Sequence, residues 1–187
     1  MDNLAKITQA ATILKQGGVI VCPTEGVYGL SALANNSQAI ERIIKIKHRA
    51  LNKGLIVVAA NVDMLSGLID MSALNEQALS LVHSKWPGHT TLILPASDQA
   101  PKLLTGGRNT LAVRVSSFSL LSRLCFTLGA PIVSTSANIS GSEPLATIEQ
   151  LRNTFASEVD YILDEPCQGL LKPSTIYDAL SGKVLRP

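Results

Sequence analysis

The sequence has 187 residues, of which 46% are hydrophobic and 4% are aromatic, and its formal net charge is +2. This length predicts one domain spanning residues 1–187, with enough apolar material for a sizeable core. The low aromatic content argues against a base-stacking binder of single strands, and the small net charge does not by itself indicate nucleic-acid binding.

Cysteine usage and the N-terminus predict where the protein works. Cys22, Cys125 and Cys167 lie far apart and form no Cys-x-x-Cys pair, so we expect reduced, mostly buried thiols and neither a disulfide framework nor a zinc site. The first residues lack the basic start and apolar centre of a signal peptide, and no apolar run is long enough to span a bilayer. We therefore expect a cytoplasmic protein with no membrane partner.

Apolar periodicity predicts helices and strands that alternate along the first half of the chain. In chain order, the pattern predicts a helix over residues 4–14, strands over 19–22 and 29–34, a helix over 37–47, a strand over 55–60, and helices over 64–69 and 75–85. We expect Ser37 to cap the second helix and residues 47–54 to form a basic loop.

The second half continues this alternation. The pattern predicts a strand over residues 90–94, an irregular segment over 95–109, a strand over 111–115, a helix over 119–128, a strand over 131–134, a helix over 147–155, and strands over 161–163, 175–177 and 183–185. A capping box at Thr147 starts the last helix. The alternation predicts an α/β domain around one twisted sheet, and the closely spaced last strands favour a mixed sheet.

The turn from Pro23 to Leu30 follows the first strand directly and contains two glycines. Turns at strand ends are where α/β proteins keep their chemistry, so we expect a site assembled from several such turns. Taken alone, Thr24 and Tyr28 fit turn and packing roles, and Glu25 fits an exposed position.

Lys47 and Arg49 are the most informative pair of cations. Residues two apart project from the same face of an extended segment, so both cations can reach one anionic ligand if the helix ends at Lys47, with Lys53 nearby. Arginine offers a planar fork to phosphate oxygens and lysine a point charge. The alternative for these residues alone is a solvated basic loop.

Other polar residues lie next to predicted strands. The segment from Ser134 to Gly141 can direct N–H and hydroxyl groups at a phosphate or carboxylate, or it can satisfy its own backbone. Arg114 lies within an apolar strand and needs a carboxylate partner or an anionic ligand, the former being the commoner case. Thr91 is a weaker signal, and Arg186 near the C-terminus is more typical of a solvated residue.

Several standard motifs are missing from the sequence. It contains no P-loop, no Gly-x-Gly-x-x-Gly fingerprint and no Gly-x-Ser-x-Gly elbow, and its three histidines have no metal-ligand spacing. We therefore expect no metal ligands from the chain and a cleft for anions. A reaction driven by positioning and charge neutralisation suits such a cleft.

Read together, the ordered motifs resemble those of the YrdC-like threonylcarbamoyl-adenylate synthases. The matching residues are Pro23-Thr24-Glu25 with Tyr28-Gly29-Leu30, Lys47-x-Arg49, Pro87-Gly88 with Thr91, Arg114-Val115, Ser136-x-Asn138 with Ser140-Gly141, Ser174-Thr175 with Asp178, and Leu185-Arg186-Pro187. They cover nearly the whole chain, which resembles the short bacterial form. One departure is His89, where Pro is frequent.

The resemblance implies a twisted open mixed sheet, flanked by helices, around a large basic cleft. It implies a nucleotidyltransferase that makes threonylcarbamoyl-AMP and pyrophosphate from L-threonine, bicarbonate and ATP, for the threonylcarbamoyladenosine modification of tRNA. Mg²⁺ would bind through the ATP phosphates and water. The product would pass to the tRNA threonylcarbamoyl-transfer machinery, with weak direct RNA binding. The alternatives are a non-catalytic RNA-binding or ribosome-maturation factor and a carbamoyl-adenylate module of hydrogenase maturation.

The resemblance also implies roles for single residues. Lys47 and Arg49 would be catalytic and hold phosphate or the carbamate. The threonine and carbamate side would be formed by Thr24, Arg114 and Ser174. ATP would be bound by Lys47, Arg49, Thr91, Ser136, Asn138 and Arg186. No residue is assigned to a metal.

Overall fold

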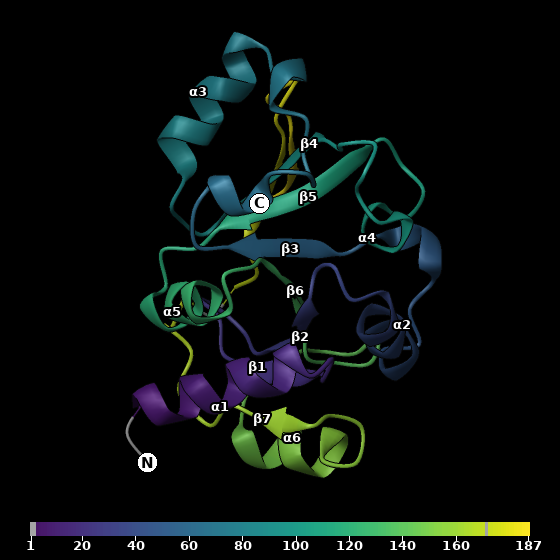
Figure 1. Ribbon diagram of the computed structural model, residues 1–187, viewed down its shortest axis with the longest axis vertical. Coiled ribbons are helices and arrows are strands. Elements are labelled where there is room, and N and C mark those ends of the chain that lie inside the picture. Colours follow the sequence, from purple (N-terminus) through teal and green to yellow (C-terminus); the bar gives the residue numbers. More distant parts are fainter. Residues whose placement is uncertain (1–2, 171) are drawn as a thin grey trace.

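One mixed sheet of nine strands organises the computed structural model, which describes residues 3–170 and 172–187 (Figure 1). The strand order is β7-β1-β2-β6-β3-β5-β4-β8-β9. The strands are β1 Ile20–Cys22, β2 Gly29–Leu33, β3 Ile56–Ala59, β4 Thr90–Pro95, β5 Thr110–Val115, β6 Ile132–Ser136, β7 Tyr161–Ile162, β8 Thr175–Asp178 and β9 Val184–Arg186. Parallel pairing joins β1 to β7, β3 to β5 and β4 to β8, whereas the other neighbouring strands pair antiparallel, so the predicted mixed α/β sheet is confirmed.

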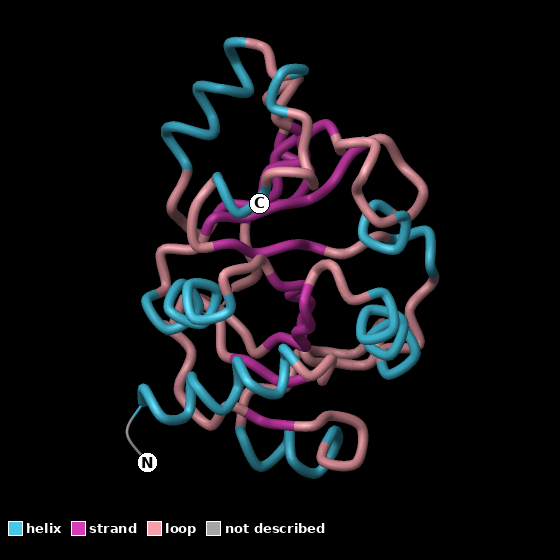
Figure 2. The backbone as a smooth tube through the Cα atoms, viewed as in Figure 1, coloured by secondary structure: helices cyan, strands magenta, loops and turns pink. Residues whose placement is uncertain are grey.

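Helices flank the strands, as the cyan and magenta segments of Figure 2 show. They are α1 Asn3–Lys15, α2 Ser37–Ile46, α3 Glu76–Lys85, α4 Lys102–Thr105, α5 Ser119–Leu128 and α6 Ile148–Phe155, with 3-10 turns at Leu51–Lys53, Asp63–Leu65 and Met71–Ala73. The predicted capping box is confirmed, because the Thr147 hydroxyl accepts from the Gln150 backbone N–H and the Gln150 side chain accepts from the Thr147 backbone N–H.

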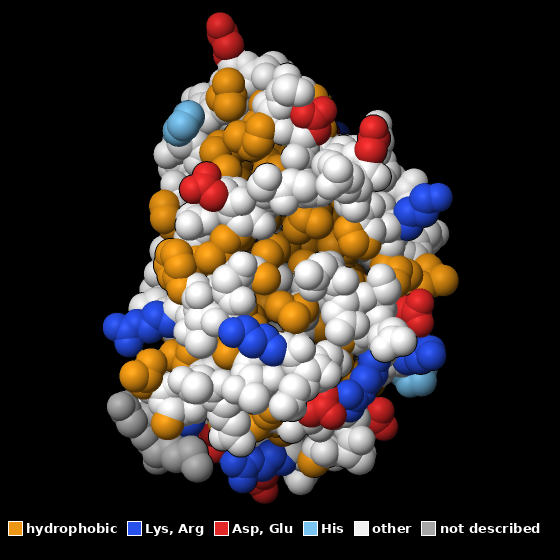
Figure 3. Space-filling view, viewed as in Figure 1, with side chains coloured by type: hydrophobic (Ala, Val, Ile, Leu, Met, Phe, Trp, Pro, Cys, Tyr) orange, Lys and Arg blue, Asp and Glu red, His pale blue; other side chains and the backbone are white. Residues whose placement is uncertain are grey.

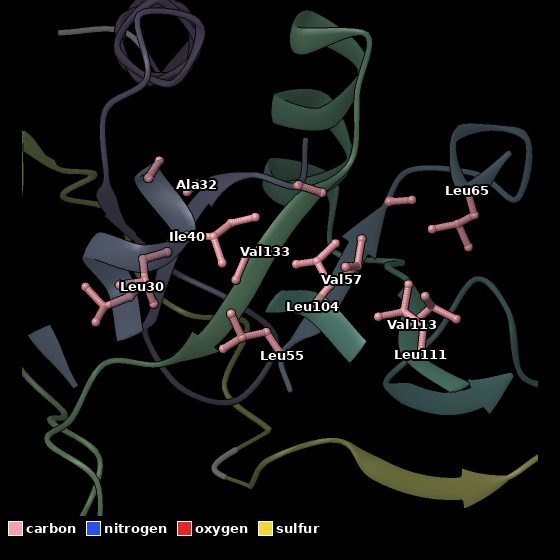
Figure 4. Packing of buried hydrophobic residues seen from close by; sticks show 14 of the residues in the cluster. Leu30, Ala32, Ile40, Leu55, Val57, Leu65, Leu104, Leu111, Val113 and Val133 are labelled. Atoms are coloured by element: carbon pink, nitrogen blue, oxygen red, sulfur yellow. The ribbon is translucent and has the colours of Figure 1, made fainter. Parts of the chain in front are cut away.

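The first face of the sheet, which we call the α2 face, carries the larger core (Figure 4). Val57, Val113 and Val133 lie on neighbouring strands and point to this face, where they belong to one cluster with Ile40 of α2 and Phe155 of α6. The isoleucines of α2 recur at helical spacing, so burial of this stripe holds the helix on the sheet.

The opposite face, which we call the α1 face, is apolar over only part of its width. Ile20, Val58 and Ile132 point to this face and pack against α1 and α5. Two residues further along β6 lies Ser134, and the register partner of Val58 on β5 is Arg114. The α1 face therefore changes from a packed core to a polar surface within one row of side chains.

Two local predictions are wrong. A helix over residues 64–69 does not form. Ser66 is extended and Gly67 is left-handed with φ 80°, so the 3-10 turn Asp63–Leu65 does not continue as a helix. The cap of α2 is Asn36 rather than Ser37, since the Asn36 side chain accepts from the Ala39 N–H. Of the segment 95–109 that was predicted to be irregular, Pro95 ends β4 and residues 102–105 form the short helix α4, and the rest is irregular apart from an isolated bridge at Ala96.

Two of the three cysteines lie in the core. Cys22 and Cys125 are fully buried, as predicted, and Cys167 is partly exposed. Within residues 3–170 and 172–187, no helix combines the length and the apolar character that crossing a membrane requires.

Candidate functional site

Three adjacent hollows lie along the polar part of the α1 face and the loops beside it. The central hollow is the one lined by Arg114, and its volume is about 170 Å³. The arginine hollow, lined by Arg108, has about 200 Å³, and the apolar hollow, lined by Cys167, has about 540 Å³. Arg49, Ile56 and Arg186 form a wall shared by the central and arginine hollows. The central and apolar hollows share four residues, Val27, Tyr28, Pro144 and Pro173. Because the central hollow shares wall residues with each of the other two, the three hollows form one row.

The central hollow brings together most of the predicted site residues. Those in its lining are Thr24, Arg49, Arg114, Ser136, Ser174 and Arg186. Lys47, Thr91 and Asn138 are not among the described lining residues. Thr91 is fully buried, and its Oγ1 lies 2.7 Å from Ser174 Oγ, so it supports Ser174 from behind. The ligand roles of all nine residues stay predictions.

The arginine hollow is lined by cations. Arg49, Lys53, Arg108 and Arg186 contribute to its wall, and no Asp or Glu occurs among the described residues that line it. Arg108 was missed by the sequence analysis, although the Gly106-Gly107 turn before it was a signal. Its guanidinium donates to the Asn52 and Lys53 carbonyls at 2.8 and 2.9 Å, so it fixes the loop that carries Lys53.

Arg49 and Lys47 do not share one face, contrary to prediction. His48 between them is left-handed, with φ 49°, so the segment is bent rather than extended. Arg49 donates from Nε and Nη2 to the Gly54 carbonyl at 3.1 and 3.0 Å and lines the hollows. Lys47 turns the other way, into the segment after β6.

The turn from Pro23 to Leu30 is tied to the loop before β8. The Gln168 and Leu170 N–H groups donate to the Thr24 and Glu25 carbonyls at 3.1 and 3.0 Å. Gly26 permits this contact, because a Cβ at this position would lie 1.9 Å from the Lys172 carbonyl oxygen. The turn and this loop therefore form a joint wall of the central and apolar hollows.

Glu25 is fully buried, so its predicted exposure is wrong. Its Oε2 lies 3.2 Å from Arg114 Nη2, and its Oε1 accepts from the Ser116 hydroxyl at 2.7 Å. The expectation that Arg114 needs a carboxylate or a ligand was the signal that could have identified Glu25. Within the described structure Arg114 Nε has no hydrogen-bond partner although it is buried, so this guanidinium retains a donor.

Burial makes this group of arginines receptive to anions. It lowers the pKa of the Arg49, Arg114 and Arg186 guanidinium groups from the ordinary value, and Glu25 acts in the opposite direction on Arg114. Neighbouring arginines add to the lowering, Arg108 for Arg49 and Arg186 for Arg114. An anionic ligand relieves this repulsion, which favours its binding.

Arg186 is a strand residue rather than a solvated terminal one. It ends β9, and its Nε and Nη2 donate to the Ser174 carbonyl at 3.1 and 2.7 Å. Ser174 Oγ lies 3.3 Å from Arg186 Nη2 as well. The C-terminal strand therefore delivers one cation to the wall between the central and arginine hollows.

Sequence comparisons place the whole chain among known proteins. The family model of the Sua5/YciO/YrdC domain, described as telomere recombination, matches residues 12–187. A threonylcarbamoyl-AMP synthase of Pseudoalteromonas translucida is 42% identical over 186 residues, which is 100% of both chains. A protein of the same name from Xanthomonas campestris pv. campestris is 40% identical, again over 100% of both.

Solved structures share the fold. P. abyssi Sua5 complexed with L-threonine superimposes with a TM-score of 0.84 at 32% identity, covering 92% of this chain and 50% of that one. The present chain thus spans about half the length of that protein. E. coli YciO gives a TM-score of 0.79 at 28% identity and covers 97% of this chain and 90% of that one. Full-length HypF, at 18% identity and a TM-score of 0.79, shows the shared fold alone.

The buried ion pair leads to a prediction about stability. Replacing Glu25 with Gln keeps the shape of the side chain but leaves the Arg114 guanidinium without its counter-charge in a buried position. We expect the free energy of unfolding, measured by urea denaturation at pH 7, to fall by about 3 kcal/mol.

Asp164→Asn is the matched control. It removes the carboxylate of an exposed pair, in which Asp164 Oδ2 lies 2.9 Å from Arg152 Nη2 and the two side chains are 49% and 59% exposed. We expect a change below about 1 kcal/mol. Equal losses in the two variants would contradict the role assigned to Glu25.

Proposed function

This chain belongs to the Sua5/YciO/YrdC family, and from that premise we propose that it is a threonylcarbamoyl-AMP synthase. The reaction joins L-threonine, bicarbonate and ATP, and the product serves the threonylcarbamoyladenosine modification of tRNA through a separate transfer machinery. The observation that carries the proposal is the row of hollows, in which a cationic compartment and an apolar compartment meet at a central one.

The lining of each hollow in the row matches the chemistry of a different part of the substrates. The arginine hollow suits the β- and γ-phosphates, because Arg49, Lys53 and Arg108 supply cationic donors there. The apolar hollow suits the adenosine, since most of its described lining side chains are apolar, with Glu143 as the one charged residue among them. The threonine carbamate belongs in the central hollow beside Arg114 and Ser174.

The α-phosphate then lies at the wall between the central and arginine hollows. Arg49 and Arg186 contribute to both, so the two guanidinium groups flank the position where the carbamate meets the phosphorus. The threonine amine and bicarbonate give the carbamate and water. A carbamate oxygen then forms a bond to the α-phosphorus, and the bond to the β-phosphate oxygen breaks as pyrophosphate leaves with its electron pair.

Both reactants are anions, so charge neutralisation dominates this step. Arg49 and Arg186 reduce the repulsion during the approach and stabilise the charge that develops on the phosphoryl oxygens. The carbamate is already an anion when it attacks, which is why the attack requires no general base. The residues of this chain bind and orient the substrates and neutralise their negative charge.

Mg²⁺ fits the site as a companion of the ATP phosphates. The described lining of the arginine hollow offers guanidinium and ammonium groups, which would hold phosphate oxygens on the sides that the metal leaves open. Mg²⁺ keeps several water ligands and binds readily through substrate phosphates. When bound, it would neutralise charge on the leaving pyrophosphate.

The RNA-binding alternative receives less support. On the face drawn in Figure 3, basic side chains are interspersed with acidic and apolar ones and form no continuous basic surface. Extended binding of a phosphate backbone depends on such a surface. The cations of the site instead line small hollows. The hydrogenase-maturation alternative rests on a likeness of fold alone.

Product formation tests the proposal directly. With ATP and Mg²⁺ present, we expect pyrophosphate release to require both L-threonine and bicarbonate, and mass spectrometry to detect threonylcarbamoyl-AMP. Arg49→Ala should lower kcat/KM by roughly 100-fold, because it removes a cation from the transferring phosphate.

Arg123→Ala is the control for the arginine replacement, since Arg123 is exposed on α5 and lies outside the three hollows. Its activity should equal that of the wild type. Pyrophosphate release that continues without threonine or without bicarbonate would refute the proposed reaction.

Alkylation of Cys167 tests the position of the adenosine. Cys167 lines the apolar hollow and is partly exposed, whereas Cys22 and Cys125 are fully buried. Burial raises the pKa of the Cys167 thiol, so labelling by N-ethylmaleimide belongs at about pH 8.5. We expect ATP to slow labelling of Cys167 at least about fivefold by occupying the hollow, as peptide mass spectrometry would measure.

Two controls make this measurement specific. The two buried cysteines should stay unlabelled with and without ATP, which reports that the protein remains folded. L-threonine alone should leave the rate at Cys167 unchanged, because threonine belongs in the central hollow. An unchanged rate in saturating ATP would place the adenosine elsewhere.

A further inference from the structure

Ser116 is a buried serine beside the site, and it is absent from the described linings of the three hollows. It follows β5 directly, two residues after Arg114, and is only 2% exposed. Its hydroxyl accepts from the Phe118 N–H at 3.1 Å and lies 2.7 Å from Glu25 Oε1. A serine hydroxyl has a single proton and an ionised carboxylate only accepts, so this proton is donated to Glu25.

The backbone of Ser116 is held from two sides. Its N–H donates to the Ala59 carbonyl at the end of β3 at 3.0 Å, and its carbonyl accepts from the Ser122 hydroxyl of α5 at 2.8 Å. One contact comes from the sheet and the other from a helix. Together they fix the point from which the Ser116 hydroxyl reaches the Glu25 carboxylate.

The bond from Ser116 sets the direction of the Glu25 carboxylate. Glu25 Oε2 lies 3.2 Å from Arg114 Nη2, within ion-pair distance, but it accepts no hydrogen bond from residues 3–170 and 172–187. Coulombic attraction depends on distance, whereas a hydrogen bond also depends on angle. In the described part of the chain, the Ser116 hydroxyl therefore supplies the only hydrogen bond that orients this carboxylate.

The carboxylate in turn holds the Arg114 guanidinium in the wall of the central hollow. The charge of Arg186, which lines the same hollow, repels Arg114, and Glu25 attracts it. A carboxylate that turned away would leave the repulsion unopposed and let the guanidinium move. Because Arg114 Nε has no hydrogen-bond partner among the described residues, no other contact of that nitrogen would keep it in place.

We propose that Ser116 is a positioning residue, which acts through Glu25 to aim the Arg114 guanidinium at the threonine carbamate in the central hollow. The inference rests on the proposed function for the identity of this ligand. The contacts that join Ser116, Glu25 and Arg114 do not depend on it.

The first experiment compares the Arg114 Nε–H signal in ¹H–¹⁵N NMR spectra of the ligand-free wild type, Ser116→Thr and Ser116→Val. Threonine and valine are similar in shape, but only threonine keeps the hydroxyl. Loss of the signal in Arg114→Lys assigns it. We expect Ser116→Thr to keep the signal at its wild-type position and Ser116→Val to shift or broaden it. One unchanged position in all three proteins would overturn the proposal.

The second experiment measures the KM values for L-threonine and for ATP. Ser116→Val should raise the KM for threonine about tenfold, because a misaligned guanidinium binds its anion less well, and should leave the KM for ATP within about twofold. Ser116→Thr should stay within about threefold of the wild type for both substrates. Equal rises in the two KM values, or equal effects of the two variants, would indicate a merely structural role and overturn the proposal.

Two further variants complete the test. Ser117→Val makes the same substitution at the exposed neighbouring position, and both KM values should match those of the wild type. If Ser116→Val does not fold, Glu25→Asp replaces it, since this change keeps the charge but draws the carboxylate back by one methylene group. It should shift the Arg114 signal, and an unchanged signal would overturn the proposal. A wild type that forms no threonylcarbamoyl-AMP would refute the proposed function, while the Arg114 signal would still decide the role of Ser116.

Discussion

Successive side chains of a β-strand point to opposite faces of the sheet, and α1 and α5 pack on only part of one of those faces. Val58 lies beneath the helices, whereas Arg114, its register partner on the next strand, lies in the central hollow. Ile132 and Ser134 repeat this change on β6. The same pleat that builds the core therefore supplies the floor of the site, so the site residues lie on a rigid framework.

Rigidity matters because the site concentrates cations. Glu25 pairs with Arg114 from below, Gly54 offers its carbonyl to Arg49, and Ser174 offers its carbonyl to Arg186. These contacts orient the three guanidinium groups before any ligand arrives, while Arg186 repels Arg114 and Arg108 repels Arg49. A site arranged in this way requires little reorganisation when an anionic substrate binds or when charge develops on a phosphoryl group.

Local patterns were sufficient for most of the elements, and the family motifs named six residues that line the central hollow, but neither revealed what distant contacts decide. The strands and the capping box at Thr147 follow from apolar periodicity and cap chemistry. The burial of Glu25 depends on Arg114 and Ser116, which lie far along the chain, so the turn alone gave no sign of it. The motif identified both Lys47 and Arg49, but a left-handed His48 separates their directions, and non-glycine residues rarely adopt that conformation.

In the function that we propose, one substrate complex extends across the three hollows, with its reacting phosphorus at the wall made by Arg49 and Arg186. The most direct test is a crystal structure of the protein with threonylcarbamoyl-AMP. We expect the adenine in the apolar hollow beside Cys167, the phosphate between the two arginines, and the threonine beside Arg114. An adenine in the arginine hollow, or an adenylate bound outside the row, would contradict it.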